Sequence, residues 1–224
     1  MPKKSYNALI TGTSRGIGKA IKELFEQNGI KVIAPDRDEM DLSSNESIEK
    51  YIQNLNEDID ILVNNAGIND LAGIEEISDA KIDEMLQVNL KSQLQLIKLL
   101  SPSMKKNNYG RIVNVSSIWG KFSKERRILY SIAKAGVNGL TVASAVELSK
   151  YNILVNAVAP GFVNTEMTSQ NNTPEQIKAL ADALPVKRMA QPEEIAEAIY
   201  FLASEKNTFI TGQTIFVDGG FSCV

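Results

Sequence analysis

Tyr130 and Lys134 are the residues of this sequence whose types and spacing most directly suggest chemistry. They stand four positions apart in the segment YSIAK, so on a helix their side chains would be neighbours about 5–6 Å apart at Cβ. Lowering a tyrosine pKa from about 10 by about 3 units requires roughly 4 kcal/mol of preferential stabilisation of the phenolate. An adjacent ammonium and a second cationic group in a partly desolvated cleft can supply that energy. The pair therefore suits a tyrosine with a lowered pKa, although such pairs also arise by chance on helices.

The residue counts exclude most other routes to catalysis. The chain has 224 residues, with no histidine and a single cysteine, Cys223. Without histidine there is no Ser-His-Asp triad, no imidazole base and no histidine-liganded metal. One cysteine excludes an intramolecular disulfide and a cysteine-cluster metal site. Catalysis must therefore rest on Tyr, Lys, Ser, Asn or carboxylates, and we expect no metal site.

The charge balance and the hydropathy pattern narrow the range of partners. The 24 Lys and Arg residues against 27 Asp and Glu give a net charge of -3, and no basic run offers nucleic acid an electrostatic footprint. No apolar run reaches membrane-spanning length, and the N-terminal MPKKSYNALITG lacks the apolar core of a signal peptide. With 43% hydrophobic residues, a chain of this length can build one large core. We expect a single cytoplasmic domain over residues 1–224 that binds neither nucleic acid nor membranes.

Apolar runs and helical patterns alternate along the whole chain, which is typical of βα units in a parallel sheet. The pattern predicts a single doubly wound α/β domain, with a mostly parallel sheet of six to seven strands and helices on both faces. Strands are expected over residues 7–11, 31–34, 60–64, 111–116, 153–159 and 213–217. Helices are expected over residues 16–28, 44–55, 78–107 with an interruption near Pro102, 127–150, 174–183 and 192–203.

The connection after the second strand is unusually short. Neighbouring parallel strands need a crossover of about a dozen residues or more, yet only Pro35 to Met40 separate this strand from Asp41 and Leu42. A helix follows directly, capped by Ser44. We therefore predict a loop or a vestigial edge strand here, which leaves six full parallel strands.

A glycine-rich turn, TGTSRGIG at residues 11–18, joins the first strand to the first helix. Glycines let the backbone approach a pyrophosphate closely, and the helix N-terminus adds amide donors and a partial positive charge. An ordinary glycine-rich turn is the alternative interpretation. Between a strand and a helix, three glycines favour a dinucleotide site, although they do not name the reaction.

Further motifs follow in a fixed order along the chain. They are NNAG at residues 64–67, Asn89 in VNL, Ser116-Ser117, Pro160-Gly161 and the terminal TGQTIFVDGG at residues 211–220. With the glycine-rich turn and YSIAK, they make the chain resemble the classical short-chain dehydrogenase/reductase family over essentially its whole length. Within that family, the C-terminal pattern looks like that of the β-ketoacyl carrier-protein reductases. The resemblance implies a Rossmann domain and an NAD(P)-dependent oxidoreductase (EC 1.1.1.-), which transfers hydride between nicotinamide and a carbonyl or secondary alcohol.

The resemblance also implies a role for each catalytic residue. Tyr130 would be the general acid/base at the substrate oxygen, and Lys134 would hold the ribose hydroxyls and depress the tyrosine pKa. Ser117 would hydrogen-bond the carbonyl or alcohol. Asn89 would anchor a water that connects Lys134 to solvent through a break in its helix.

The same resemblance implies the cofactor contacts. Residues near the phosphates, the riboses, the adenine and the nicotinamide would be Gly12, Ser14, Arg15, Ile17, Asp36, Arg37, Asp41, Leu42, Asn65, Ala66, Gly67, Pro160, Gly161, Val163 and Thr165, together with Tyr130 and Lys134. The asparagines of NNAG are also expected to tie neighbouring strands together.

The choice between NAD and NADP depends on charged residues near the end of the second strand. Asp36 would accept hydrogen bonds from the adenosine ribose and repel a 2′-phosphate, which favours NAD. Arg15 and Arg37 stand where NADP-dependent relatives clamp that phosphate, unless they pair instead with Asp36 or Asp38. An unneutralised carboxylate discriminates strongly against a phosphate, so we favour NAD(H) over NADP(H).

The segment between Ser117 and Tyr130 is bulky and basic, with the sequence IWGKFSKERR at residues 118–127. It either attracts an anionic substrate or forms a solvated basic turn. Where the carrier-protein reductases have docking arginines, this chain has Asn108 and Lys150-Tyr151. The substrate is therefore left as a small oxo compound, a sugar derivative or a 3-oxoacyl thioester. Substrate contacts are expected from Trp119, Arg126, Arg127 and Phe162.

The alternative function is a non-catalytic one, in which a sensor or scaffold binds a dinucleotide without turning it over. The intact set of Asn89, Ser117, Tyr130 and Lys134 argues against it. A catalytic protein would lose turnover, but keep its cofactor, when the tyrosine hydroxyl is removed.

The helices expected over residues 78–107 and 127–150 are apolar on more than one face. A helix of this kind requires a second packing partner. Members of the family pair these helices across a two-fold axis, so we expect a homo-oligomer, either a dimer or a homotetramer.

Overall fold

Six parallel strands form the centre of the molecule. The computed structural model describes residues 6–170 and 172–224. The strands are β1 (Asn7–Ile10), β2 (Lys31–Ile33), β3 (Ile61–Asn64), β4 (Gly110–Val115), β5 (Ile153–Pro160) and β6 (Thr214–Val217). They pair in the order β2-β1-β3-β4-β5-β6, and every pair is parallel. The strand order changes direction between β1 and β3, so the doubly wound α/β prediction is confirmed.

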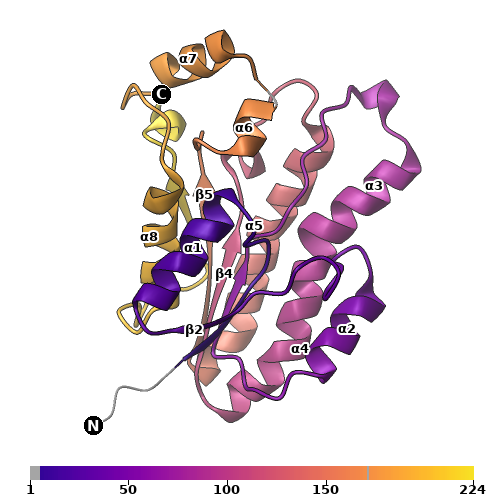
Figure 1. Ribbon diagram of the computed structural model, residues 1–224, viewed down its shortest axis with the longest axis vertical. Coiled ribbons are helices and arrows are strands. Elements are labelled where there is room, and N and C mark those ends of the chain that lie inside the picture. The colour runs from indigo at the N-terminus through magenta and orange to yellow at the C-terminus, as the bar shows by residue number, and fades with distance from the viewer. Residues whose placement is uncertain (1–5, 171) are drawn as a thin grey trace.

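Helices cover both faces of this sheet, as Figure 1 shows, with α1 and α8 on one side and α2, α4 and α5 on the other. The helices are α1 (Gly16–Gln27), α2 (Asn45–Gln53), α3 (Asp79–Leu86), α4 (Ser92–Lys106), α5 (Ile128–Leu148), α6 (Glu166–Gln170), α7 (Pro174–Ala183) and α8 (Pro192–Ala203). Successive side chains of a strand point to opposite faces. Ala8 and Ile10 therefore join the core beneath α1 and α8, whereas Leu9 joins the core beneath α2, α4 and α5.

Local sequence explains several of the element boundaries. Gly29 follows α1 with a positive φ of 77°, a conformation that favours glycine and ends the helix. Ser44 caps α2 by accepting a hydrogen bond from the backbone N–H of Ser47 at 3.2 Å. Between β2 and α2, the described residues 34–44 contain turns and no strand, and Met40 anchors them in the core. The prediction of a short connection and six full strands is confirmed.

The long helix expected over residues 78–107 is not interrupted where the sequence suggested. Pro102 lies within α4, and its side chain is exposed. The irregularity lies instead at Gln87–Lys91, a π-helical segment that joins α3 to α4 and contains the buried Asn89. The predicted break near Pro102 is therefore wrong, whereas the helix break that the resemblance implied at Asn89 is present as this π segment.

The sequence analysis did not predict several short elements. The 3₁₀ turns Ile74–Glu76, Ile118–Gly120 and Phe221–Cys223 and helix α6 follow the carboxyl ends of strands, whereas the 3₁₀ turn Ser149–Tyr151 precedes β5. Figure 1 shows α6 and α7 at one end of the molecule, with the C-terminus beside α7. Across the part of the chain that the structure describes, no helix has the length and apolar character to cross a membrane.

A chain of buried polar side chains ties the centre of the sheet to α5. The Asn64 amide donates to Asn114 Oδ1 at 2.8 Å, joining β3 to β4. The Asn114 amide donates in turn to Thr141 Oγ1 at 2.9 Å, and Thr141 donates to the Val137 carbonyl at 2.8 Å. The expectation that the NNAG asparagines link strands is met by Asn64.

Candidate active site

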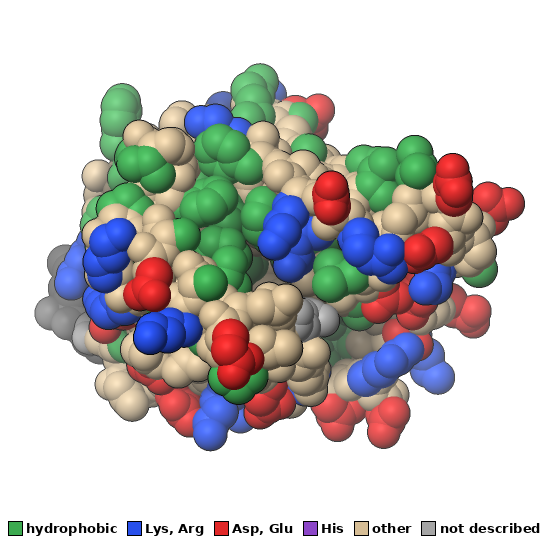
Figure 2. All heavy atoms as spheres, turned by 90° about the horizontal axis from the view of Figure 1, so that it is seen from above, with side chains coloured by type: hydrophobic (Ala, Val, Ile, Leu, Met, Phe, Trp, Pro, Cys, Tyr) green, Lys and Arg blue, Asp and Glu red, His purple; other side chains and the backbone are tan. Residues whose placement is uncertain are grey.

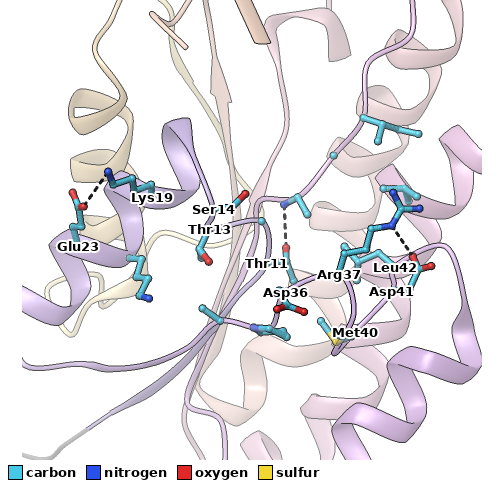
Figure 3. A pocket seen from close by; sticks show the side chains of 18 of the residues that line it. Thr11, Thr13, Ser14, Lys19, Glu23, Asp36, Arg37, Met40, Asp41 and Leu42 are labelled. Carbon is cyan, nitrogen blue, oxygen red and sulfur yellow. Dashed lines mark hydrogen bonds and ion pairs between the residues drawn. The ribbon is translucent and has the colours of Figure 1, made fainter. Parts of the chain in front are cut away.

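Two cavities lie at the carboxyl edge of the sheet. The larger, of about 720 Å³, is lined by the loops that follow β1, β2 and β3 and by one side of α1. Figure 3 shows Thr13 and Ser14 between Lys19 and Glu23 of α1 and the segment that carries Asp36 and Arg37. Predicted cofactor residues that line this cavity are Gly12, Ser14, Asp36, Arg37, Asp41, Leu42, Ala66 and Gly67.

The glycine-rich turn has a shape that only glycine permits. Gly12 and Gly16 have positive φ angles of 71° and 54°, and a Cβ on Gly18 would lie 1.9 Å from the Gly12 carbonyl oxygen. The first turn of α1 contains no acidic side chain, and Arg15 at its N-cap makes no capping hydrogen bond with its side chain. The helix N-terminus therefore keeps its amide donors and partial positive charge for an anion such as a pyrophosphate, so these residues fit a dinucleotide.

Side chains fix this turn against the loop that follows β3. The Thr11 hydroxyl accepts hydrogen bonds from the backbone N–H groups of Asn65 at 3.1 Å and Ala66 at 3.0 Å. The Asn65 amide donates to the carbonyls of Thr11 at 3.0 Å and Gly12 at 2.9 Å. Asn65 thus holds the backbone of the turn from behind, and Ala66 and Gly67 form the cavity wall.

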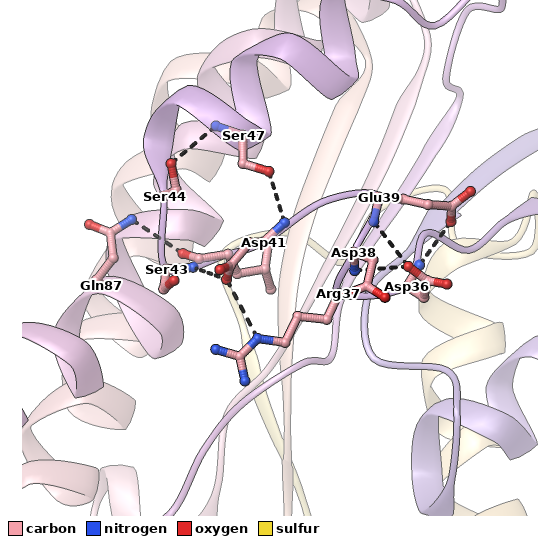
Figure 4. Close-up of polar contacts among 10 residues, drawn as sticks. Asp36, Arg37, Asp38, Glu39, Asp41, Ser43, Ser44, Ser47 and Gln87 are labelled. Carbon is pink, nitrogen blue, oxygen red and sulfur yellow. Dashed lines mark hydrogen bonds and ion pairs between the residues drawn. The ribbon is translucent and has the colours of Figure 1, made fainter.

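The segment after β2 carries the charges that face the adenosine end of the cavity. Asp36 Oδ1 accepts the backbone N–H groups of Asp38 and Glu39, both at 2.9 Å (Figure 4). Arg37 reaches Asp41 at 3.9 Å, whereas Arg15 pairs with Glu166 at 3.0 Å. The expectation that these arginines pair with Asp36 or Asp38 is therefore wrong. No cation pairs with the Asp36 carboxylate among residues 6–170 and 172–224, because both guanidinium groups are drawn to other carboxylates.

Lys134 is buried where β4 meets α5. Its side chain is 2% exposed, and Nζ donates a hydrogen bond to the Val115 carbonyl at 2.7 Å. Desolvation lowers the pKa of Lys134 from 10.5 to about 8. Nζ lies 5.5 Å from the centre of the Tyr130 ring, so the two residues are neighbours as the spacing predicted.

The Tyr130 phenol is half-buried beside Ser117. Burial raises the pKa of Tyr130, while its hydrogen bond with the Ser117 side chain and the positive charge of Arg127 both lower it. Burial outweighs both effects, so the pKa of the phenol lies above its ordinary value, whereas the sequence analysis expected the adjacent Lys134 ammonium to lower it. Ser117 Oγ also accepts the Trp119 backbone N–H at 3.2 Å, and Ser116 instead bonds Asn138 at 2.7 Å, away from the phenol.

Asn89 binds the loop after β3 rather than an element of the sheet. Its Oδ1 accepts the Ile68 N–H at 2.9 Å, and its Nδ2 donates to the Ile68 carbonyl at 2.8 Å. The Asn89 carbonyl accepts a hydrogen bond from Gln93 Nε2 at 3.0 Å. A Cβ on Gly67 would lie 3.0 Å from Asn89 Oδ1 and 3.8 Å from Lys134 Nζ, so Gly67 lies between the two polar groups.

The second cavity, of about 390 Å³, contains Ser117 and Tyr130 in its wall. Trp119, Phe162 and Phe221 form one side of it, with ring centres 5.6 to 6.1 Å apart in edge-on contacts. Trp119 and Phe162 were expected, whereas Phe221 was missed because it belongs to a terminal 3₁₀ turn. Its signal in the sequence was an aromatic residue directly after the glycines of VDGG.

The two adjacent arginines before Tyr130 take different positions. Arg126 has a positive φ of 66° and forms a two-pronged ion pair with Glu76, at 3.0 and 2.6 Å. Arg127 lines the second cavity, where its guanidinium carbon lies 5.0 Å from the Trp119 ring centre. Burial lowers the pKa of Arg127, and Tyr130 opposes that shift. Figure 2, which looks onto the end of the molecule that carries α6 and α7, shows hydrophobic side chains leading to a hollow with Lys and Arg at its rim.

The remaining predicted cofactor residues lie around the cavities rather than in the wall of the larger one. Gly161 lines the second cavity, and a Cβ there would lie 2.7 Å from the Asp218 backbone. Thr165 lies beside the glycine-rich turn, since its Cγ2 would be 3.3 Å from a Cβ on Gly16. Pro160 ends β5, Val163 is buried in a bridge with Ala190, and Ile17 packs against the core.

The buried ammonium predicts an unusual dependence of stability on pH. Lys134→Met removes a charge whose burial costs about 3 kcal/mol, and loses one hydrogen bond of about 1 kcal/mol. We expect the variant to be more stable than the wild type at pH 7 by about 1–2 kcal/mol. Because the native pKa of about 8 is below the unfolded value of 10.5, wild-type stability rises relative to the variant between those pH values.

Urea unfolding of the cofactor-free protein at pH 7 and pH 10 measures this difference. Lys98→Met, at an exposed position of α4, is the matched control and should show no pH-dependent difference from the wild type. An advantage of Lys134→Met that stayed constant between the two pH values would contradict the assignment of a buried charge.

Comparison with known proteins agrees with this geometry. Residues 38–222 match the family model described as enoyl-(acyl carrier protein) reductase. The chain is 38% identical to the uncharacterized oxidoreductase YmfI of Bacillus subtilis, over 96% of this chain and 98% of that protein. It is 39% identical to the 3-oxoacyl-[acyl-carrier-protein] reductase FabG of Thermotoga maritima, over 95% of this chain and 96% of that protein.

Solved structures give the same result. A 4-hydroxyisoleucine dehydrogenase complexed with NADH superimposes with a TM-score of 0.93, at 27% identity, over 98% of this chain and all of the other. The NADP-bound protein ElxO superimposes with a TM-score of 0.89, at 30% identity, over 99% of this chain and all of the other. The sequence match, the sheet order and the nicotinamide-bound neighbours together place this chain in the short-chain dehydrogenase/reductase family, as an NAD(P)-dependent oxidoreductase that resembles the 3-oxoacyl-[acyl-carrier-protein] reductases.

Proposed function

We propose that this protein interconverts the carbonyl group of a small oxo compound and the corresponding secondary alcohol, with Tyr130 as the general acid/base. The observation that carries the proposal is the position of Ser117 and Tyr130 in one cavity wall, with the buried Lys134 beside the phenol ring. The cofactor supplies hydride chemistry when it is bound. The glycine-rich turn, Asp36 and Gly67 would hold its adenosine and phosphate end in the larger cavity.

The proton chemistry follows from the residues around the phenol. During reduction, the Ser117 and Tyr130 hydroxyls hydrogen-bond the substrate oxygen, and Tyr130 Oη gives up its proton as the carbonyl carbon accepts a hydride. The C=O π bond breaks, and one C–H and one O–H bond form. The ammonium of Lys134 stabilises the phenolate that results, because two opposite charges attract strongly in a desolvated site. During oxidation, the same phenolate accepts the alcohol proton.

Asn89 has a positioning role in this scheme. Its side chain holds the Ile68 backbone, which fixes the loop between the two cavities, and its carbonyl already accepts a bond from Gln93. The route by which Lys134 exchanges protons with solvent is proposed to run past this π-helical segment. The widened turn there displaces main-chain carbonyls from the regular hydrogen-bonding pattern.

Removing the phenolic hydroxyl tests the catalytic assignment. Tyr130→Phe should lower kcat by at least about a thousandfold, since a positioned acid contributes about 10²–10⁴ and the hydroxyl also orients the substrate. Cofactor binding, measured by fluorescence titration, should remain within a few-fold of the wild type.

Tyr200→Phe is the control, because Tyr200 packs against Phe25 of α1 and lines neither cavity. Unchanged turnover in Tyr130→Phe would refute the mechanism. A wild type that binds cofactor but reduces no carbonyl would favour the alternative function, a sensor or scaffold.

The cofactor preference proposed here is for NAD(H). Asp36 lines the larger cavity, and no cationic side chain among the described residues pairs with its carboxylate. This negative charge would repel the 2′-phosphate of NADP(H). Arg37 is engaged by Asp41 and Arg15 by Glu166, so two candidate phosphate ligands already have carboxylate partners. Both ion pairs are exposed, and an exposed ion pair contributes about 1 kcal/mol or less. The proposed preference for NAD(H) therefore rests mainly on the Asp36 carboxylate.

The ratio of kcat/KM for NADH to that for NADPH tests this preference. We expect the wild type to favour NADH and Asp36→Asn to reduce the ratio about tenfold, because the amide keeps the turn but removes the charge. Asp38→Asn, two residues away and outside the cavity lining, should leave the ratio unchanged. A wild type that prefers NADPH would overturn the proposal.

We also propose that the protein is a homo-oligomer assembled through α4 and α5. Leu94 on α4, and Val142 and Val146 on α5, are 52%, 51% and 78% exposed, so both helices present apolar side chains away from the sheet. Such faces are favourable sites for a second copy of the chain across a two-fold axis.

Val146→Glu should dissociate this assembly, because a carboxylate at the contact would be desolvated without a partner. Light scattering should then report a smaller species than for the wild type. Ile74→Glu, which alters an equally exposed apolar residue at 72% exposure outside α4 and α5, should leave the mass unchanged. A monomeric wild type would refute the proposal.

A further inference from the structure

Arg127 is a cation in the wall of the substrate cavity that has no carboxylate partner in the described parts of the chain. Its neighbour Arg126 is neutralised by Glu76, and Arg15, Arg37 and Arg188 pair with other carboxylates. The Arg127 guanidinium instead lies over the Trp119 ring, at 5.0 Å from its centre. A half-buried guanidinium without an anion is costly unless a ligand supplies one.

The position of this cation relates it directly to the reacting group. Arg127 is the N-cap residue of α5, Tyr130 lies three residues later, and the charge of the guanidinium acts on the phenol by lowering its pKa. Both side chains line the same cavity of about 390 Å³. A molecule whose carbonyl oxygen meets the Tyr130 hydroxyl therefore places groups only a few bonds away against Arg127.

The rest of the cavity fits a small polar molecule. Its aromatic side, formed by Trp119, Phe162 and Phe221, limits its size. Asn69 adds a buried Oδ1 atom that accepts no hydrogen bond within the described residues. Lys124 also lines the cavity and adds a second positive charge. A neutral thioester, which has no charge beside its carbonyl, would leave both cations without a counterion.

We infer that Arg127 binds an anionic group of the substrate beside the reacting carbonyl, so that the substrate is a small oxo compound carrying a carboxylate or a phosphate. The guanidinium has a planar fork of donors that matches either anion with two hydrogen bonds. This inference rests on the proposed function for the site, and it adds the chemical class of the substrate.

The first test compares matched substrates that differ only in charge. Acetoacetate is paired with its methyl ester, and dihydroxyacetone phosphate with dihydroxyacetone. The wild type should favour the anionic member of at least one pair by about 10- to 100-fold in kcat/KM, as charge-assisted hydrogen bonds are worth about 1.5–3 kcal/mol. Which pair shows the preference distinguishes a carboxylate from a phosphate.

Variants locate the preference at one side chain. Arg127→Gln should abolish the preference by raising KM for the anion, and Arg127→Lys should restore part of it because the charge returns without the planar fork. Lys121→Gln removes the same charge from the same segment, at a residue that lies over Phe122 and lines neither cavity. This control should retain the wild-type preference.

A binding measurement separates this inference from the proposed function. Trp119 is the only tryptophan of the chain and lies against Arg127, so its emission reports an anion at the guanidinium. Without cofactor, acetoacetate or dihydroxyacetone phosphate should change this emission saturably, and Arg127→Gln should weaken the binding at least about tenfold.

The possible outcomes are distinct. Absence of turnover with saturable, Arg127-dependent binding would refute the proposed oxidoreduction of these compounds but support the anion site. Turnover without any preference for the anions, or binding that Arg127→Gln leaves unchanged, would overturn the inference. No saturable change with either anion in the wild type would also overturn it.

Discussion

The hydrogen bond from Lys134 Nζ to the Val115 carbonyl is the interaction on which the rest of this site depends. It joins the last residue of the central strand β4 to the second turn of α5, and it keeps an ammonium group in a place where water does not reach it. Tyr130 lies one helical turn earlier, so the end of the strand fixes the phenol as well. Such a charge is costly to bury, and in the proposed mechanism it would stabilise the Tyr130 phenolate.

The surrounding loops owe their shape to side chains that bind main-chain groups. Thr11 and Asn65 hold the glycine-rich turn against the loop after β3, and Asn89 holds that loop through both polar groups of Ile68. Asn64 extends the connection to the neighbouring strand β4. Loops at the ends of parallel strands usually vary in position, whereas here the turn after β1 and the loop after β3 are held by these polar contacts. This part of the wall of the larger cavity is therefore preorganised before any ligand enters.

Much of the fold could be predicted from the sequence, because buried parallel strands and amphipathic helices leave regular patterns. The six strands and the short connection after β2 follow from such patterns. The helix break at Asn89 was expected only because the family resemblance implied it, since no residue pattern shows how that side chain meets Ile68 across the fold. The sequence also could not show that Arg126 pairs with Glu76 while Arg127 lines the second cavity. The two side chains are identical, and they point in different directions because Arg126 has a positive φ. Phe221 was missed for a related reason, as only the folded chain brings the terminal turn to Trp119.

The short connection after β2 bears on how the cofactor preference of such a protein can change during evolution. Asp36 and Arg37 belong to a turn outside the hydrogen-bonded ladder of the sheet, and within the described part of the chain the Asp36 carboxylate accepts hydrogen bonds only from amides of its own turn. Exchanging these residues therefore breaks no contact between strands and disturbs no core packing. If these residues set the cofactor preference as proposed, substitutions at a few exposed positions could change the preferred dinucleotide without altering the buried groups to which the proposed mechanism assigns proton transfer. Specificity for the coenzyme and competence for the reaction can thus evolve separately in this chain.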